Sequence, residues 1–221
     1  MIVSIAGNIG SGKSTLIKKL HEKGYNVYEE PVHKWSLLPR FYTNMERWSF
    51  SLQVQILMSI LEFPKNKVNI VERSPWESLK IFSQYAKDHS LFDPIEFCLL
   101  ESLHDKLAWT PDLFIYLQCN PDVCIERIKH RGRECENDID PQYVKDLHIY
   151  YEKEIIQEKN TLIINAEEDC DTVMNNVNIC LMKYKNNDSK NSFFHLANDF
   201  YNIMCMVFRI LYKKRNKYGK F

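Results

Sequence analysis

The stretch GNIGSGKST at residues 7–15 restricts the possible folds of this chain more than any other feature. It matches the pattern G-x-x-x-x-G-K-[ST], in which glycines let backbone N–H groups converge on phosphate oxygens at the start of a helix. An apolar run at residues 1–6 precedes it, and residues 15–23 follow with the apolar spacing of a helical face. A glycine-rich turn with a chance lysine is the alternative, but strand, loop and helix together predict a site for a nucleoside triphosphate. Lys13 is expected to reach the outer phosphates, and the Ser14 hydroxyl to bind Mg²⁺.

The residues expected to form the phosphate loop are Gly7, Asn8, Ile9, Gly10, Ser11, Gly12, Lys13, Ser14 and Thr15.

Length and charge favour one ordinary α/β domain. The chain has 221 residues, and Lys+Arg and Asp+Glu both total 29, so nothing in the overall charge favours a nucleic-acid partner. The seven cysteines form no C-x-x-C pair and no zinc-type spacing, which is typical of free thiols in a reducing compartment. Because the first apolar run begins at residue 2, we expect no signal or transit peptide and a cytoplasmic location.

Short apolar runs alternate with helical patterns along most of the chain. Such alternation predicts a parallel sheet covered by helices on both faces, with the active site beyond the carboxyl ends of the strands. The expected strands are residues 2–6, 25–28, 68–71, 113–117 and 162–164.

Charged residues follow the second and third of these runs. Glu30, stiffened by the proline after it, is suited to act as a general base. Glu72 is suited to hold Mg²⁺ through water, and the Arg73 guanidinium to bind an oxyanion through paired hydrogen bonds. Each taken alone is as well explained by a surface salt bridge, but their position at strand ends beside the phosphate loop favours a functional role.

Residues 44–62 have the pattern of a long helix, on which Gln53, Ile56 and Ile60 share one face. An amide among apolar neighbours needs partners, because leaving it unpaired costs about 1–3 kcal/mol. The edge of a nucleic-acid base is one suitable partner, and a neighbouring backbone group is the alternative.

An arginine-rich segment follows the fourth run. Arg127 and Arg131 are four residues apart on an expected helix, and Arg133 follows a glycine. A solvated basic face is the usual explanation of such a cluster. With a triphosphate expected nearby, a mobile cationic lid at residues 127–139 is the better interpretation.

The end of the chain differs in composition from the rest. Residues 183–192 form a polar linker, and residues 193–212 are apolar but contain Asp199 and Arg209. With these charges the segment is a poor membrane span. We expect a tail at residues 193–221 that packs on its own domain or on a dimer partner, in preference to one that lies on an anionic membrane surface.

Over residues 1–182 the sequence resembles the deoxyribonucleoside kinase family. Beyond the phosphate loop and the lid, the shared marks are E-P-V-x-K-W at 30–35, E-R-W-S-F-x-x-Q at 46–53 and E-R-S at 72–74. The resemblance implies a P-loop NTPase fold of the nucleoside kinase type, with five parallel strands, and usually a homodimer. It also implies phosphorylation of a deoxynucleoside at its 5′-hydroxyl by ATP with Mg²⁺, as in nucleotide salvage.

Matching positions give roles to individual residues. Glu30 is implied as the base at the 5′-oxygen, with Arg73 beside it, while Gln53 bonds the base edge and Phe82 stacks on it. The residues implied to contact the nucleoside are Glu30, Trp35, Leu38, Tyr42, Gln53, Ile56, Ile60, Arg73, Ser78, Phe82 and Glu136, with Tyr42 and Glu136 at the sugar 3′-hydroxyl. Those implied at the phosphates are Lys13, Arg127, Arg131 and Arg133, those at Mg²⁺ are Ser14 and Glu72, and those at adenine are Asp169 and Cys170. Cys170 lacks the aromatic ring often found there.

Two other functions share part of these features. A thymidylate-type nucleoside monophosphate kinase has the same sheet, loop and lid, but needs a further cationic site for the acceptor's phosphate. A non-catalytic nucleotide-binding module has no use for Glu30 or for the Gln53 helix, and the N-K-x-D motif of nucleotide switches is missing from the sequence.

Two positions indicate the preferred base. Family members that prefer purines or deoxycytidine have an arginine and an aspartate where this chain has Ile60 and Ser78. An apolar Ile60 leaves room beside a thymine methyl group, whose burial contributes about 1 kcal/mol. We therefore expect thymidine and deoxycytidine to be preferred over purines, although a bulky Phe41 tightens the pocket.

Overall fold

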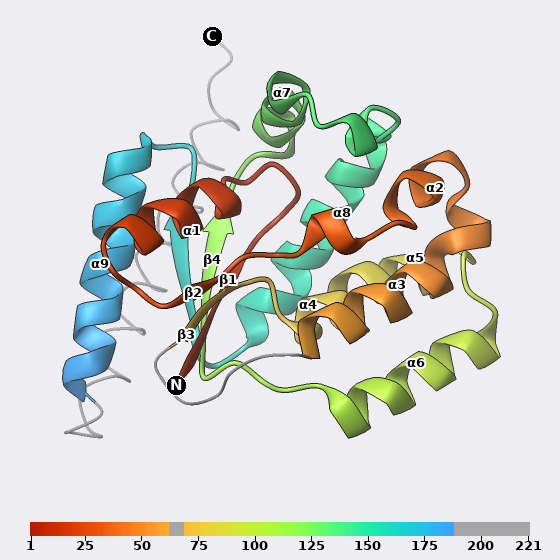
Figure 1. Cartoon of the computed structure of the whole chain (residues 1–221), viewed down its shortest axis with the longest axis horizontal. Helices are drawn as coiled ribbons and strands as arrows, with labels where there is room; N and C mark the ends of the chain where they lie inside the picture. Colours follow the sequence, from red (N-terminus) through yellow and green to blue (C-terminus); the bar gives the residue numbers. More distant parts are fainter. Residues whose placement is uncertain (62–68, 188–221) are drawn as a thin grey trace, which may run out of the picture. The chain divides into compact units, whose positions relative to one another are not determined.

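The computed structural model describes residues 1–61 and 69–187 (Figure 1). The chain divides into two compact units, Met1–Asn176 and Val177–Phe221. The expected tail lies outside the described residues, as do Glu62 and Val68 at the ends of an expected helix and an expected strand. The domain limit at residue 182 stays a prediction.

A five-stranded sheet lies at the centre of the first unit, and all its strand pairs are parallel, as the sequence predicts. The order is β2-β3-β1-β4-β5, so the chain builds outward on one side of β1 and then crosses to the other. Such a reversal opens a crevice at the carboxyl ends of the central strands. The strands are β1 (Ile2–Ala6), β2 (Val27–Tyr28), β3 (Asn69–Glu72), β4 (Leu113–Gln118) and β5 (Thr161–Asn165).

Local sequence signals start three of the longer helices, α6, α7 and α8. Proline occupies the first turn of α6, α7 and α8, and the side chains of Asp93, Asn120 and Asp140 cap these helices. The helices are α1 (Lys13–Glu22), α2 (Leu38–Thr43), α3 (Met45–Leu61), α4 (Pro75–Glu77), α5 (Gln84–Asp88), α6 (Pro94–Leu107), α7 (Pro121–Arg131), α8 (Pro141–Glu154) and α9 (Cys170–Asn187). None of the helices in the described ranges is both long and apolar enough to cross a lipid bilayer.

Helices cover both faces of the sheet, as expected (Figure 1). On one face α1 contacts β1, β2 and β3 and buries its apolar stripe of Leu16, Ile17 and Leu20. On the other face Tyr116 of β4 stacks on Tyr151 of α8, with ring centroids 5.6 Å apart and planes within 9°. The alternation of side chains along each strand therefore gives both faces a hydrophobic covering.

Two expected elements have different limits in the structure. The second strand is shorter than residues 25–28 because the Tyr25 N–H bonds the Leu20 carbonyl at 3.1 Å and completes the end of α1. Helix α9 continues to Asn187, so residues 183–187 of the expected polar linker are helical.

A π-helical segment, Ser78–Ser83, connects α4 to α5. The Ser83 hydroxyl donates to the Ser78 carbonyl at 2.7 Å, one residue further back than the usual helical spacing. Widened turns of this kind contain an extra residue and are frequent at functional sites. Here the segment places Ser78 and Phe82 on the wall of the main cavity.

Candidate active site

A cavity of about 750 Å³ lies at the carboxyl ends of the strands. Residues at or just beyond the ends of all five strands contribute to its wall, which is where an open parallel sheet binds its ligands. Most residues expected at the site line it: Ile9, Gly10, Ser11, Gly12, Lys13, Ser14, Thr15, Glu30, Trp35, Leu38, Tyr42, Gln53, Ile56, Glu72, Arg73, Ser78, Phe82, Arg127, Arg131, Arg133, Glu136 and Cys170.

The phosphate loop needs glycine at two points of its curl. Gly10 has φ +82°, and a Cβ atom there would lie 2.4 Å from the Cys124 carbonyl oxygen of α7. Gly12 has φ +100° and begins α1. Only glycine adopts these conformations without strain, so the N-terminus of α1 stays open toward the cavity as an anion site.

Lys13 lies directly after this loop and is buried. Its Nζ atom donates to the carbonyls of Gly7 and Asn8, at 2.8 and 2.7 Å. Burial, and next the positive charge of Arg73, lower the Lys13 pKa to about 8, although the surrounding carboxylates oppose the shift. The ammonium group is thus under-solvated, a condition that an anionic phosphate would relieve.

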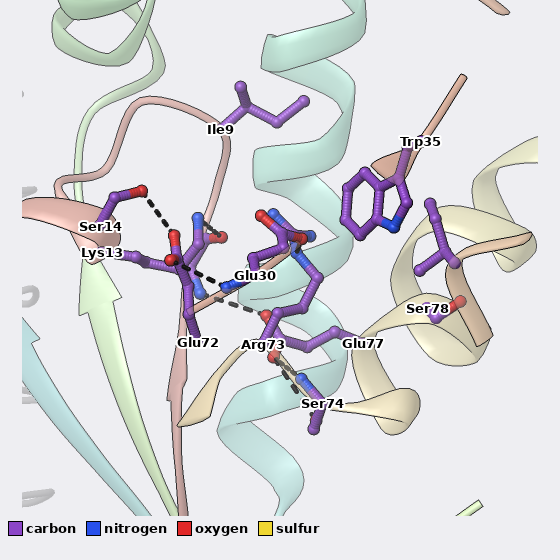
Figure 2. A network of polar contacts seen from close by, with 12 residues as sticks. Ile9, Lys13, Ser14, Glu30, Trp35, Glu72, Arg73, Ser74, Glu77 and Ser78 are labelled. Carbon is purple, nitrogen blue, oxygen red and sulfur yellow. Dashed lines mark hydrogen bonds and ion pairs between the residues drawn. The ribbon is translucent and has the colours of Figure 1, made fainter. Parts of the chain in front are cut away.

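Ser14 and Glu72 form a pair suited to Mg²⁺ (Figure 2). The Ser14 hydroxyl donates to Glu72 Oε1 at 2.6 Å, and the Glu30 N–H donates to Glu72 Oε2 at 3.3 Å. Burial and the adjacent Glu30 carboxylate raise the Glu72 pKa, so a cation here would be favoured. Within the described ranges no group of three or more His, Cys, Asp or Glu side chains can hold a metal by itself. One hydroxyl and one carboxylate fit a Mg²⁺ ion that takes its remaining oxygens from phosphates and water.

Glu30 and Arg73 form a buried ion pair beside the loop, with Arg73 Nε 2.5 Å from Glu30 Oε1. Burial opposes the charge of Arg73, but Glu30, Tyr151 and Glu77 outweigh it and raise its pKa, so Arg73 stays a cation. Arg73 also has φ +65°, an uncommon backbone conformation for a residue with a side chain. Strain of this kind at a charged cavity residue is typical of a functional site.

The pocket beyond this pair is largely apolar and has one polar anchor. The Ser78 hydroxyl donates to Gln53 Oε1 at 2.7 Å, and both side chains are buried. The Arg73 guanidinium lies 4.3 Å from the centre of the Phe82 ring, which holds that ring in place. Trp35 donates from Nε1 to the Ser59 hydroxyl at 2.9 Å, so its indole is also fixed. A flat base would meet an aromatic face and an amide edge here.

The expected lid is tied to the expected sugar site. Glu136 is buried and accepts from Arg131 Nη2 at 2.5 Å and from Arg133 Nη1 at 3.0 Å. Burial and the Glu136 carboxylate raise the Tyr42 pKa, so the Tyr42 hydroxyl stays protonated. A hydrogen-bond donor and an acceptor for a sugar hydroxyl therefore lie close together on the cavity wall.

Arg127 joins the loops that follow three strands. It donates from Nη1 to the Ser11 carbonyl at 3.4 Å and to Cys119 Sγ at 3.6 Å, and from Nη2 to the Ala166 carbonyl at 2.9 Å. Arg127 thus holds the phosphate loop to the loop after β5, where adenine is expected.

Four expected residues do not line the cavity: Gly7, Asn8, Ile60 and Asp169. Ile60 packs on the core, and its carbonyl accepts a bond from Trp109 Nε1 at 2.9 Å. Asp169 accepts from the N–H groups of Asp171 and Thr172 at the start of α9. The sequence reasoning also passed over wall residues: Leu16, Lys18, Lys19, Glu22, Val32, Phe41, Leu52, Leu117, Tyr143, Ala166, Glu168 and Val173. Phe41 is expected from the sequence only as a bulky neighbour of the pocket. Leu16, Leu52, Tyr143 and Val173 are buried helix residues with no polar mark, whereas Lys18, Lys19, Glu22 and Glu168 are charged residues outside the recognised motifs.

Comparisons with known proteins identify relatives of this chain. A family model described as deoxynucleoside kinase matches residues 3–204. The putative kinase protein 029R of Invertebrate iridescent virus 3 is 38% identical over 181 residues, which cover 80% of this chain and 93% of the relative. The deoxyadenosine/deoxycytidine kinase of Bacillus subtilis (strain 168) is 32% identical over 162 residues, which cover 68% of this chain and 75% of the relative.

Among solved structures, deoxyadenosine kinase from M. mycoides with products dCMP and a flexible dCDP bound has a TM-score of 0.76 to this chain at 26% identity. The match covers 83% of this chain and 100% of the other. This chain belongs to the deoxynucleoside kinase family.

Proposed function

We propose that this deoxynucleoside kinase transfers the γ-phosphoryl group of ATP to the 5′-hydroxyl of a deoxynucleoside, with Mg²⁺, and prefers pyrimidines. The observation that carries the proposal is the buried Glu30–Arg73 pair, which faces the same cavity as the phosphate loop. A carboxylate held there has a use in accepting a proton from an attacking hydroxyl. We place the product in deoxynucleotide salvage and the enzyme in the cytoplasm.

In this mechanism the chain positions the reactants and stabilises charge, as phosphoryl transfer requires. Glu30 accepts the proton of the 5′-hydroxyl, and Arg73 holds the Glu30 carboxylate in place. Lys13 and the lid arginines stabilise the charge that develops on the transferred group. Ser14 and Glu72 would hold Mg²⁺, which when bound neutralises phosphate charge.

The preference for pyrimidines rests on the shape and polarity of the pocket. Phe41 is buried with edge contacts to Tyr42 and Tyr143, at ring distances of 5.3 and 5.8 Å, so this wall does not readily open for a larger base. A serine hydroxyl both donates and accepts, so Gln53 keeps its bond to Ser78 in either amide orientation and can meet thymine or cytosine. Ile60 gives no support, because it does not line the cavity. The Bacillus subtilis relative is named for deoxyadenosine and deoxycytidine, which makes thymidine the substrate to test most carefully.

The test is ADP formation by the purified protein with ATP-Mg, measured separately for four deoxynucleosides and for their 5′-monophosphates. We expect the highest kcat/KM for thymidine or deoxycytidine. Higher kcat/KM for deoxyadenosine or deoxyguanosine would contradict the base preference, and turnover of monophosphates alone would contradict the acceptor. Glu30→Gln should lower kcat about 10²-fold or more, as expected for loss of a general base.

We also propose a homodimer that forms through α3 and α6, two helices in contact with each other. Ile95 and Leu99 lie one turn apart on α6 with exposures of 78% and 51%, and Met58 of α3 has an exposure of 58%. Burying such neighbouring apolar side chains favours association. Ile95→Asp with Leu99→Asp should convert a dimer to a monomer in light scattering. The control is Ile149→Asp, at an equally exposed position on α8. A wild-type monomer would contradict the proposal.

A further inference from the structure

Glu77 is a fully buried carboxylate to which the proposed reaction assigns no role. As the third residue of a short capped helix, α4, its Oε2 accepts the Ser74 N–H at 3.0 Å. A capping box explains that contact, but such a glutamate needs only one oxygen and normally lies near solvent. Complete burial of the side chain indicates a further role.

The remaining contacts of the Glu77 carboxylate reach three other elements. Oε1 accepts from the Tyr151 hydroxyl of α8 at 2.9 Å and from the Gly7 N–H of the phosphate loop at 3.4 Å. Oε2 also accepts from the Ser4 hydroxyl of β1 at 3.3 Å. The carboxylate thus connects the phosphate loop to α8, the helix that contributes Tyr143 to the cavity wall.

Tyr151 continues this connection to the catalytic pair. Its hydroxyl donates to Glu77 and accepts from Arg73 Nη1 at 3.2 Å, while Arg73 Nε contacts Glu30. Burial strongly raises the Tyr151 pKa, so the proton needed for the bond to Glu77 is retained. Figure 2 shows Glu30 and Arg73 close together, with Lys13 on one side of them and Glu77 on the other.

We propose that Glu77 and Tyr151 are positioning residues for phosphoryl transfer, which hold the Arg73 guanidinium at the angle that aims Glu30 at the acceptor hydroxyl. The inference rests on the proposed function, because it takes Glu30 as the base. The guanidinium is a planar fork with donors on several sides, so a partner on one side alone leaves it free to pivot. Tyr151 fixes the side remote from Glu30, and Glu77 fixes Tyr151. A shift of about 1 Å in a catalytic group can lower a rate by as much as 10²-fold.

The chain contains a matched control for this connection. Tyr116 and Tyr151 are both buried, their rings stack on each other, and the Tyr116 hydroxyl also donates to a carboxylate, Glu152 Oε1, at 3.0 Å. Tyr151→Phe and Tyr116→Phe therefore remove the same group from the same ring stack. Of the two hydroxyls, that of Tyr151 is the one bonded to Arg73.

The test compares both variants with wild type for thermal unfolding, for equilibrium binding of thymidine and deoxycytidine, and for kcat with ATP-Mg. We expect both to lower Tm to a similar extent. Tyr151→Phe should lower kcat about tenfold or more and leave nucleoside affinity within about twofold, because the contacts of the bound nucleoside are unchanged. Equal kcat values for the two variants would overturn the proposal.

Two further variants separate this inference from the proposed function. Glu77→Gln should lower kcat as Tyr151→Phe does, and the double variant should be no slower than the worse single one, because both break one connection. Additive losses would overturn the connection. If Glu30→Gln is inactive while Glu77→Gln and Tyr151→Phe are fully active, the base stands and the positioning role fails. Full activity of Glu30→Gln would overturn both.

Discussion

Burial of a charged lysine at the phosphate loop should cost the ligand-free enzyme stability. The Lys13 pKa falls from 10.5 to about 8, chiefly through burial. A lowering of about 2.5 units at 1.36 kcal/mol each amounts to roughly 3 kcal/mol of destabilisation near neutral pH. Lys13→Met removes this cost but also loses two charge-assisted hydrogen bonds, to the carbonyls of Gly7 and Asn8, each contributing about 1.5 kcal/mol or more. The two effects nearly cancel, so near neutral pH we expect Lys13→Met to differ from wild type by no more than about 1 kcal/mol, or about 2–4 °C in Tm, and to lose activity.

The sign of the pH dependence follows from the two pKa values. Between about pH 8 and pH 10.5 the unfolded chain binds more protons at this lysine than the folded one, so wild-type stability rises with pH across that window. Lys13→Met lacks this rise. The free energy of unfolding of Lys13→Met relative to wild type should therefore be highest below about pH 8 and should fall toward pH 10.

Urea unfolding of wild type and Lys13→Met at about pH 7 and about pH 9.5 measures the stability difference at neutral pH and its change with pH. Lys18→Met, at an exposed position of the same helix, serves as the control and should keep the wild-type pH dependence. The reasoning is refuted if the difference in free energy of unfolding between Lys13→Met and wild type is the same at both pH values.

Three further substitutions test the site. In Gly10→Ala the new Cβ atom would clash with the Cys124 carbonyl, and the positive φ would cost an alanine about 1–2 kcal/mol. The affinity for ATP should therefore fall about tenfold or more. Unchanged affinity in a titration would contradict the loop geometry. Ser14→Ala removes the partner of Glu72 and should raise the Mg²⁺ concentration for half-maximal rate about tenfold, whereas an unchanged Mg²⁺ curve would remove Ser14 from the metal site. Glu136→Gln weakens a charge-assisted bond contributing about 1.5–3 kcal/mol, so KM for the nucleoside should rise at least about tenfold. KM for ATP serves as its control, and an effect on ATP alone would place Glu136 in the lid rather than at the sugar.

The sheet and the phosphate loop were predictable because their signals are local. An apolar strand, a glycine-rich loop with Lys13 and an amphipathic helix are contiguous in sequence, and strand ends such as Glu30 and Arg73 meet wherever parallel strands end together. The cavity brings these residues together as expected. Their catalytic roles stay predictions.

Other parts of the site depend on contacts that sequence spacing does not contain. Glu77 and Tyr151 are 74 positions apart, and each has an ordinary local explanation, as a helix-capping residue and as a core-facing aromatic. The S-x-x-E pattern ending at Glu77 is a signal that marks a helix start, but not its burial. Ile60 shows the opposite case: it shares a helix face with Gln53, yet it lies two turns further along α3, where the side chain packs against the core and does not line the cavity.

The π-helical segment that holds Ser78 and Phe82 has a consequence for sequence length. Because such a turn accommodates one extra residue, deleting a residue there would let the backbone relax into an ordinary α-helix and keep its hydrogen bonds. Every side chain beyond the deletion would then turn by about 100° relative to the residues before it. Phe82 would leave the cavity wall while the helix itself survived. Alignment gaps at this segment would therefore separate homologues that keep this pocket from homologues that keep only the fold.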